Sequence, residues 1–404
     1  MIDTLNEPRE IDAAEIDRAA SAANEPGWVR ESRRAAFERY AAMPQPTERT
    51  PGWRRADLTG IDFSPAPMGA SAFAVEAAAA DLERGVVACS LSEALAMHER
   101  VVRGALERVH RAQTLGKFSA LAESAWREGA FVYVPDGVEL SSPIHLTSSA
   151  GSYPRLLAIV GKNARASIAE THRCGSRLSA GVTDLILEDG AHLTYAHVQE
   201  CGERTVALSH QRARLARDAK LVTLNFGIGG RFARADIEVE LLGPGAESDM
   251  LGLVFAERSQ QFDYHTVQGH RAPSTRSDLL FKSALGGSAH AVYTGVIIIE
   301  KFAQKSDAYQ ANRNLILSDG ARADTEPMLE IEANDVRCTH GATVGPIDEE
   351  QLFYLQSRGL DASDAARLVV EGFFAEVLQK VGDERLTGSL QEKVAPHLGR
   401  DGGA

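Results

Sequence analysis

The sequence predicts a mainly β protein with helical ends, in which a right-handed parallel β-helix core is flanked by N-terminal and C-terminal α-helical regions. Three observations support this fold class. Residues 130–345 contain many short β-type runs bounded by glycine-rich turns and few helical patterns. A turn motif recurs inside this stretch at an almost constant spacing. Residues 1–129 and 346–404 have apolar residues at helical spacing instead.

The internal repeat distinguishes among the possible β folds. Its best-defined copies place an alanine after each turn, at Ala164, Ala191, Ala219 and Ala246, with spacings of 27, 28 and 27 residues. This period is too long for hexapeptide β-helices, and the pattern of leucine-rich repeats is absent. A stack in which each coil covers the apolar face of the next fits the spacing. A β-sandwich is the alternative.

Two structural expectations follow from the repeat. The four alanines should stack on successive coils, about 4.8 Å apart. Cys174 and Cys201 each follow their aligned alanine by ten residues, so the two thiols should be neighbours on adjacent coils. Such a pair can belong to a sulfur or metal relay, but a ladder of interior side chains is the simpler interpretation. Similar turns recur less regularly at 318–324 and 339–345.

The N-terminal region, 1–129, is predicted to be helical. Residues 9–42 are rich in alanine, glutamate and arginine, with a break at 24–27 where Pro26 suits the first turn of a second helix. A proline-punctuated linker follows, and 92–110 and 117–128 have helical patterns.

The C-terminal region, 346–404, begins where a strand is predicted to end. In that strand, Leu329 and Ile331 alternate with glutamates, which is typical of a strand with one buried face. Asp348 is placed to cap a helix that ends near Gly359. A second helix carries an apolar stripe up to Val381 and ends at Gly382.

Composition excludes several classes of function. The 404 residues have a formal net charge of −13, which disfavours binding to nucleic acid or to anionic lipid. The longest apolar run, 292–299, is too short to span a bilayer, and the N-terminus has no secretory pattern. We therefore expect a cytoplasmic protein. The sequence has no phosphate-binding loop of the ATPase type and no hydrolase or metalloprotease motif, so we expect no catalytic residues.

Cys338 and His340 form the best local pair of candidate ligands. They lie two residues apart on a predicted strand, so both side chains should leave the same face. A thiolate and an imidazole suit iron, zinc or copper(I), although two ligands do not complete a tetrahedral site. The alternative is structural: a small buried cysteine and a histidine that caps a turn.

Three segments also carry a family resemblance. RNLILSDGARADTEPMLEI, VRCTHGATVG and IDEEQLFYLQSRGL together resemble the C-terminal signature of the SufB/SufD family of iron–sulfur cluster assembly proteins. The cysteine-threonine-histidine run is closer to the SufD branch. The dense similarity covers about 263–378, and a looser one extends over the whole chain.

The resemblance implies a non-catalytic scaffold subunit of a SufB–SufC–SufD complex, with ATP hydrolysis in SufC. In SufD proteins the histidine of this motif lies at the junction with SufB, where the nascent cluster is built. His340 occupies that position, and Cys338 matches a neighbouring cysteine. The cofactor would be a transient iron–sulfur cluster or iron at the subunit interface, with none permanently bound.

The resemblance also assigns a role to the C-terminal helices. In this family they dock the SufC ATPase, which makes Phe353 and Tyr354 candidate partner-binding residues. The chain alone can also form a homodimer. A SufB-type paralogue is the first alternative; a β-helix enzyme acting on carbohydrate is the second. SufB proteins are usually longer and carry a sulfur-accepting cysteine of their own.

Overall fold

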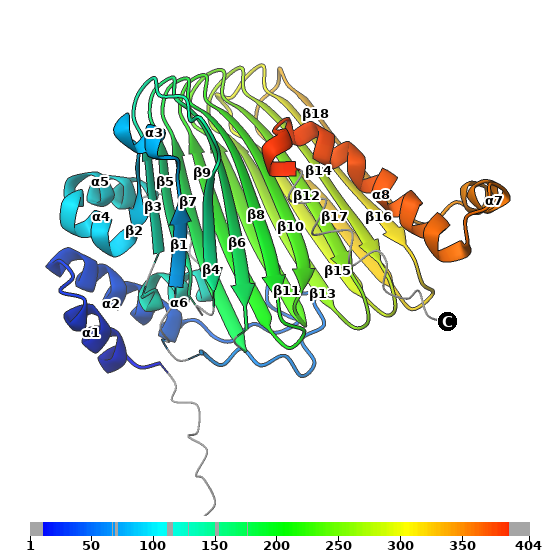
Figure 1. Ribbon diagram of the computed structural model, residues 1–404, viewed down its shortest axis with the longest axis horizontal. Coiled ribbons are helices and arrows are strands. Elements are labelled where there is room, and N and C mark those ends of the chain that lie inside the picture. Colours follow the sequence, from blue (N-terminus) through cyan, green and yellow to red (C-terminus); the bar gives the residue numbers. More distant parts are fainter. Residues whose placement is uncertain are drawn as a thin grey trace, which may run out of the picture.

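The computed structural model describes residues 11–387 except 67, 69–71, 111–115, 128, 150–152 and 176. Its centre is a solenoid of two nine-stranded sheets, and each coil of the chain adds one strand to each sheet (Figure 1). Between β4 and β18 in one sheet, and between β3 and β17 in the other, all strand pairs are parallel. With helices at both ends, this arrangement confirms the predicted fold class.

The strands of the two sheets alternate along the chain. Sheet A contains, in spatial order, β1 (Ala72–Glu76), β4 (Ile144–Ser149), β6 (Arg165–Cys174), β8 (His192–Cys201), β10 (Lys220–Gly229), β12 (Glu247–Ala256), β14 (Arg276–Leu285), β16 (Asp307–Ile316) and β18 (Arg337–Pro346). Sheet B contains, in the same direction, β2 (Val87–Ser90), β3 (Gly129–Val134), β5 (Arg155–Val160), β7 (Leu178–Leu187), β9 (Val206–Leu215), β11 (Phe232–Leu241), β13 (Gln261–His270), β15 (His290–Ile299) and β17 (Arg322–Ile331).

The strand register confirms the predicted repeat. The residues that follow Ala164, Ala191, Ala219 and Ala246 pair in one continuous ladder, and all four alanines are fully buried. A small side chain fits here because each coil turns tightly against the next. Cys174 pairs with Cys201 across β6 and β8, as the repeat predicts. The turn predicted at 318–324 connects β16 to β17, whereas 339–345 lies inside β18 and is not a turn.

Six helices lie in the described part of the N-terminal region: α1 (Ala13–Ala22), α2 (Gly27–Ala42), α3 (Ala79–Glu83), α4 (Leu91–Met97), α5 (Glu99–His110) and α6 (Lys117–Ala125). Of these, α4 and α6 contact strands of sheet B, α2 packs on α6, and α1 packs on α2. Buried Arg33 on α2 donates to the carbonyl oxygens of Ser124 and Trp126, which fixes α2 to the end of α6. The linker that follows α2 places Trp53 stacked on Phe232 of β11, with ring centroids 6.2 Å apart.

Two short strands in this region were not predicted. β1 pairs antiparallel with β4, and β2 pairs antiparallel with β3. They close the first coil of each sheet, so the solenoid has no free parallel edge at its N-terminal end.

Two helices follow the solenoid. α7 (Glu349–Ser357) starts at Asp348, whose carboxylate accepts the backbone N–H of Glu350 at 2.8 Å. Gly359 and Gly382, at φ +96° and +71°, follow the ends of α7 and α8 (Ala362–Val381), as the sequence predicts. α8 crosses the outer face of sheet A (Figure 1) and buries an apolar stripe against β10, β12 and β14. None of the described helices is both long and apolar enough to cross a membrane.

Candidate functional site

The last strand of sheet A carries the two candidate ligands. Cys338 pairs with Ala308 and His340 with Gln310 of β16, so both side chains lie on the face of β18 that continues the interior of the solenoid. Among the described residues, no further strand pairs with β18. The side chain of His340 is consequently exposed, while Cys338 is half-buried beside Ala308 and Ala333.

The surroundings of the pair differ in polarity. Cys338 joins a small apolar cluster, and burial, with the charge of Asp307, raises the pKa of its thiol. At neutral pH this sulfur therefore carries its proton until a metal displaces it. Below His340 lies Gln310, which is buried and whose Oε1 has no hydrogen-bond partner. The imidazole of His340 is thus accessible to solvent and lies next to the polar side chain of Gln310.

Neither ligand is part of a complete metal site in this chain. Among the residues that the structure describes, no three histidine, cysteine, aspartate or glutamate side chains gather closely enough to hold a metal ion. An iron held by Cys338 and His340 would need further ligands besides this pair, because iron and zinc sites take about four.

The surface around the pair is the bare end of the solenoid. Leu329 and Ile331 of β17 pair with Ile297 and Ile299 of β15, and the two inner isoleucines are fully buried. Their counterparts on β17 are 37% and 41% exposed, because no coil stacks on them. The strand predicted for this segment is confirmed, but the predicted burial of its apolar face is wrong.

The end is also open at the level of the backbone. In the part of the chain that the structure describes, β17 and β18 are the last strands of their sheets, and each is ten residues long with one edge unpaired. Exposed strand edges with apolar side chains are templates for pairing with another chain. The open coil therefore has the two properties of a docking surface for a second sheet.

The two predicted partner-binding residues lie on α7, which projects from the body of the protein (Figure 1). No residue of α7 is buried; Phe353 is 73% exposed and Tyr354 57% exposed. Both aromatic side chains are thus accessible to a partner, although the structure contains none.

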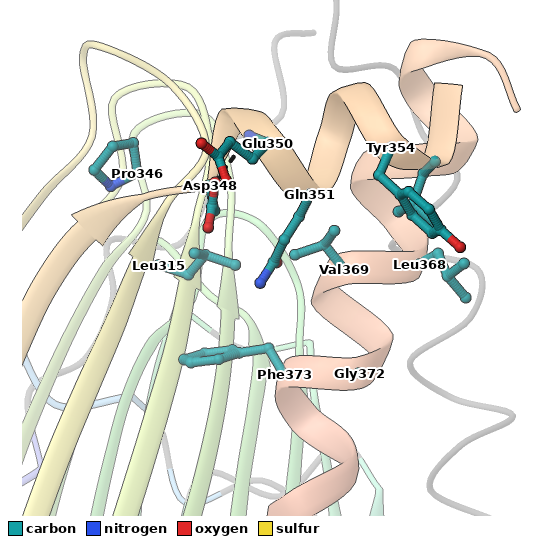
Figure 2. A pocket seen from close by; sticks show the side chains of 11 residues that line it. Leu315, Pro346, Asp348, Glu350, Gln351, Tyr354, Leu368, Val369, Gly372 and Phe373 are labelled. Atoms are coloured by element: carbon teal, nitrogen blue, oxygen red, sulfur yellow. Dashed lines mark hydrogen bonds between the residues drawn. The ribbon is translucent and has the colours of Figure 1, made fainter. Parts of the chain in front are cut away.

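A cleft of about 740 Å³ separates α7 from α8 and the ends of β16 and β18. Tyr354 lines it together with Leu368, Val369 and Phe373 of α8 (Figure 2), whereas Phe353 does not. The cleft continues the exposed aromatic surface of α7.

α8 gives this cleft a firm wall. Its residues Val370, Phe374 and Val377 are buried against sheet A. Lys282 of β14, itself buried, donates to the backbone oxygen of Phe373 and to the carboxylate of Glu376, each at 2.6 Å. Because a buried ammonium is costly without its partners, these contacts fix the position of α8 on the sheet.

A second cluster of reactive side chains lies inside the solenoid and was only partly predicted. Besides the stacked Cys174 and Cys201, it contains Glu170 and His172, whose carboxylate and imidazole are 2.6 Å apart. The sequence signal was the alternation of these residues with Cys174 on β6, which places them on one face.

Comparison with known proteins identifies the family to which the solenoid belongs. Residues 144–373 match the family model described as SUF system FeS cluster assembly, SufBD core domain. An iron–sulfur cluster assembly SufBD family protein of Mycobacterium tuberculosis is 33% identical over 295 residues, which are 69% of this chain and 74% of the relative.

Relatives of lower identity match a similar share of this chain. SufBD family proteins of Synechocystis and Staphylococcus epidermidis are each 28% identical, over 69% and 72% of this chain and 65% and 64% of their own lengths. The matched region spans the solenoid from β4 to β18 together with α7 and half of α8. The chain belongs to the SufBD family of iron–sulfur cluster assembly proteins.

Proposed function

We propose that this chain is the SufD-type scaffold subunit of a cytoplasmic SufB–SufC–SufD complex, and that its open coil helps to form the site where a cluster is assembled. The observation that carries the proposal is the position of His340. It is an exposed imidazole on the only coil of the described solenoid that is not covered by another coil or by a cap.

The open coil supports a partner with a similar open end. Edges of β17 and β18 can each accept a strand, and the apolar side chains of Leu329, Ile331 and Val344 can be covered by a facing coil. A SufB-type paralogue offers such a coil. Two copies of this chain can meet in the same way, which is the expected homodimer when the partner is missing.

The ligands suit an iron–sulfur cargo that does not stay bound. Cys338 and His340 contribute a soft sulfur and a borderline nitrogen donor on one side of the junction. A cluster or iron ion held there would be completed by the partner's donors and would be released once its ligands move apart. The chain itself performs no catalytic step in this scheme; it positions ligands and joins subunits.

The C-terminal helices support a second partner, the ATPase SufC. The aromatic side chains of Phe353 and Tyr354 stand on a helix with no buried residue, next to a cleft. Exposed aromatic residues beside a groove are enriched at protein interfaces. Because α8 is anchored on sheet A, a movement of the docked ATPase would act directly on the solenoid.

The test replaces His340 in a strain whose only SufD-type subunit is the variant. His340→Ala removes a metal ligand and a proton carrier from an exposed position, so folding and recovery of the complex should change little. The activity of cluster-dependent enzymes should nevertheless collapse. Cys338→Ser should reduce activity less, because its thiol plays a supporting role.

The matched control is Thr339→Ala, since Thr339 is exposed on the opposite face of the same strand. This variant should keep both the complex and the activity. Wild-type activity with His340→Ala would remove the residue from the mechanism. Loss of the complex in His340→Ala alone would assign it a structural role.

A further inference from the structure

Four side chains on two adjacent strands make a distinct site inside the solenoid. Glu170, His172 and Cys174 occupy alternate positions of β6 and point into the interior. Cys201 of β8 pairs with Cys174 in the strand register. Both cysteines are free thiols and are buried, at 7% and 9% exposure.

On the next strand of sheet A, no side chain continues the stack of Cys174 and Cys201. The next residue in register with Cys201 is Gly229 of β10, which has φ +73° and no side chain to cover the sulfur. A surface pocket of about 390 Å³ opens at this point, lined by Cys201, Gly229 and Phe255. Its rim includes Glu203 and Arg258, whose side chains are exposed. A small molecule can therefore reach Cys201 from solvent, and Cys174 is its direct neighbour in the strand register.

A buried carboxylate polarises the site. Glu170 is fully buried and accepts hydrogen bonds from the hydroxyls of Tyr195 and Thr183, besides its contact with His172. Burial alone would lower the pKa of His172, but the charge of Glu170 and its hydrogen bond to the imidazole together raise that pKa. An imidazolium ion is thus favoured two residues before Cys174 on the same face.

The two thiols differ because of this environment. A hydrogen bond from Cys201 opposes the effect of burial and, with the charge of His172, lowers the pKa of Cys174 to about 7. The same hydrogen bond and burial raise the pKa of Cys201. Cys174 therefore loses its proton more readily and is the better nucleophile of the two, while Cys201 stays protonated. If the two cysteines only filled space in the interior, the site would need neither the buried carboxylate of Glu170 nor a difference in pKa between the two thiols.

We propose that Cys174 and Cys201 form a redox-active pair, which a small hydroperoxide oxidises to a disulfide joining two adjacent coils. With hydrogen peroxide, the thiolate of Cys174 attacks one peroxide oxygen and the O–O bond breaks. The leaving hydroxide takes a proton from the imidazolium of His172 and becomes water. Cys201 then attacks the sulfur of the Cys174 sulfenic acid. The S–S bond forms, and hydroxide leaves with the proton of Cys201 as a second water.

The backbone allows this product. Paired residues on adjacent strands lie about 4.8 Å apart, and disulfides form across Cα separations of about 4.4–6.8 Å. Two thiols and one hydrogen peroxide give one disulfide and two waters, so the hydroperoxide is the only oxidant needed. The site is independent of the junction at His340 and goes beyond the proposed scaffold function.

The experiment treats the purified full-length chain with hydrogen peroxide and maps the cysteines by alkylation and mass spectrometry over time. The wild-type chain should form the Cys174–Cys201 disulfide at least about tenfold faster than Cys89 or Cys338 is oxidised. Burial raises the pKa of Cys89 to about 11, so it is a matched internal comparison. A thiol reductant should restore both thiols.

Two variants separate the steps. Cys201→Ser should leave a sulfenic acid on Cys174 that a dimedone probe captures, while Cys89→Ser should not change the rate of disulfide formation. The proposal fails if the wild-type chain oxidises Cys89 or Cys338 as fast as Cys174. It also fails if Cys174 and Cys201 are oxidised without becoming linked. Both of these measurements use the wild-type chain, so they do not depend on the folding of any variant.

Discussion

The two ends of the solenoid are built from the same repeat but finished differently. At the N-terminal end, β1 and β2 run antiparallel along the first strands of the two sheets, and Val132 and Val134 of β3 are fully buried. At the C-terminal end, β17 and β18 have no such neighbour within residues 11–387 as described, and Ile331 is 41% exposed.

The difference shows that the repeat itself does not determine whether an end of the solenoid is capped. A terminal repeat must be covered to keep a solenoid monomeric and soluble. Two short strands and several helices cover the N-terminal end of the solenoid. The C-terminal end remains apolar and carries His340 and Cys338. An uncovered coil of this kind is a liability in a free protein, and the proposed partner would cover it.

The largest expected effect comes from placing a charge on the open end. Ile331→Glu should weaken the association with a SufB-type partner, or of two copies of this chain, by more than about 100-fold, since a buried unpaired carboxylate costs about 3 kcal/mol or more. The melting temperature of the free chain should change little, because Ile331 is partly exposed there. Analytical ultracentrifugation and co-purification measure both quantities.

The control for this variant is Leu242→Glu. The exposed fraction of Leu242, 37%, is similar to that of Ile331, 41%. Leu242 directly follows β11, however, and lies far from the open end. This variant should assemble normally. Equal loss of association in both variants would mean that the open coil is not the interface, and the comparison between the two ends would lose its functional meaning.

The second prediction concerns histidines inside the coils, in contrast to exposed His340. Burial lowers the pKa of His197 to about 3 and that of His270 to about 4. The unfolded chain takes up these protons near pH 6.5, whereas the folded chain refuses them until the pH is much lower. Folding stability should therefore fall between pH 7 and pH 5, by about 2 kcal/mol for each histidine.

The test compares chemical unfolding of the wild type and of His270→Gln at the two pH values. His270 hydrogen-bonds Thr275 and Ser277, which glutamine can still reach in part. The variant should lose less stability on acidification than the wild type, by about 2 kcal/mol, whatever its stability at pH 7. An unchanged pH dependence in His270→Gln would show that His270 is not held neutral.

The contrast between the ends also explains what sequence could predict. The spacing of Ala164, Ala191, Ala219 and Ala246 fixed the register of the coils, because equivalent turns need equally small residues. β1 and β2 were missed because they lie outside the repeat and pair antiparallel. Their sequences contain no signal that names a partner strand.

The candidate site was predictable in part for a similar reason. Alternation placed Cys338 and His340 on one face, and the strand register confirms it. Alternation at Leu329 and Ile331 shows which face can be buried, but not whether another coil exists to bury it. For Glu170 and His172, the sequence shows a charged and a titratable residue on a strand; only the closed coil makes them interior.

The smallest expected effect tests the helix beside the open end. Deleting everything after Gly345 would uncover the apolar outer face that α8 protects, including Phe226 and Phe255, so a point substitution is the cleaner experiment. Tyr354→Ala removes an aromatic side chain that is 57% exposed and lines the cleft. Binding of the ATPase subunit should weaken about tenfold or more, equivalent to about 1.4 kcal/mol, since exposed aromatic side chains often carry interface energy.

Phe302→Ala is the matched control for this helix, because Phe302 is 79% exposed and lies in the turn between β15 and β16. Titration calorimetry with the purified ATPase subunit should show wild-type affinity for Phe302→Ala and reduced affinity for Tyr354→Ala. Both variants should melt at the wild-type temperature, because neither side chain is buried. If Tyr354→Ala binds the ATPase subunit like the wild type, the ATPase does not dock through this aromatic side chain. The proposed interface at this end of the molecule would then be limited to the open coil.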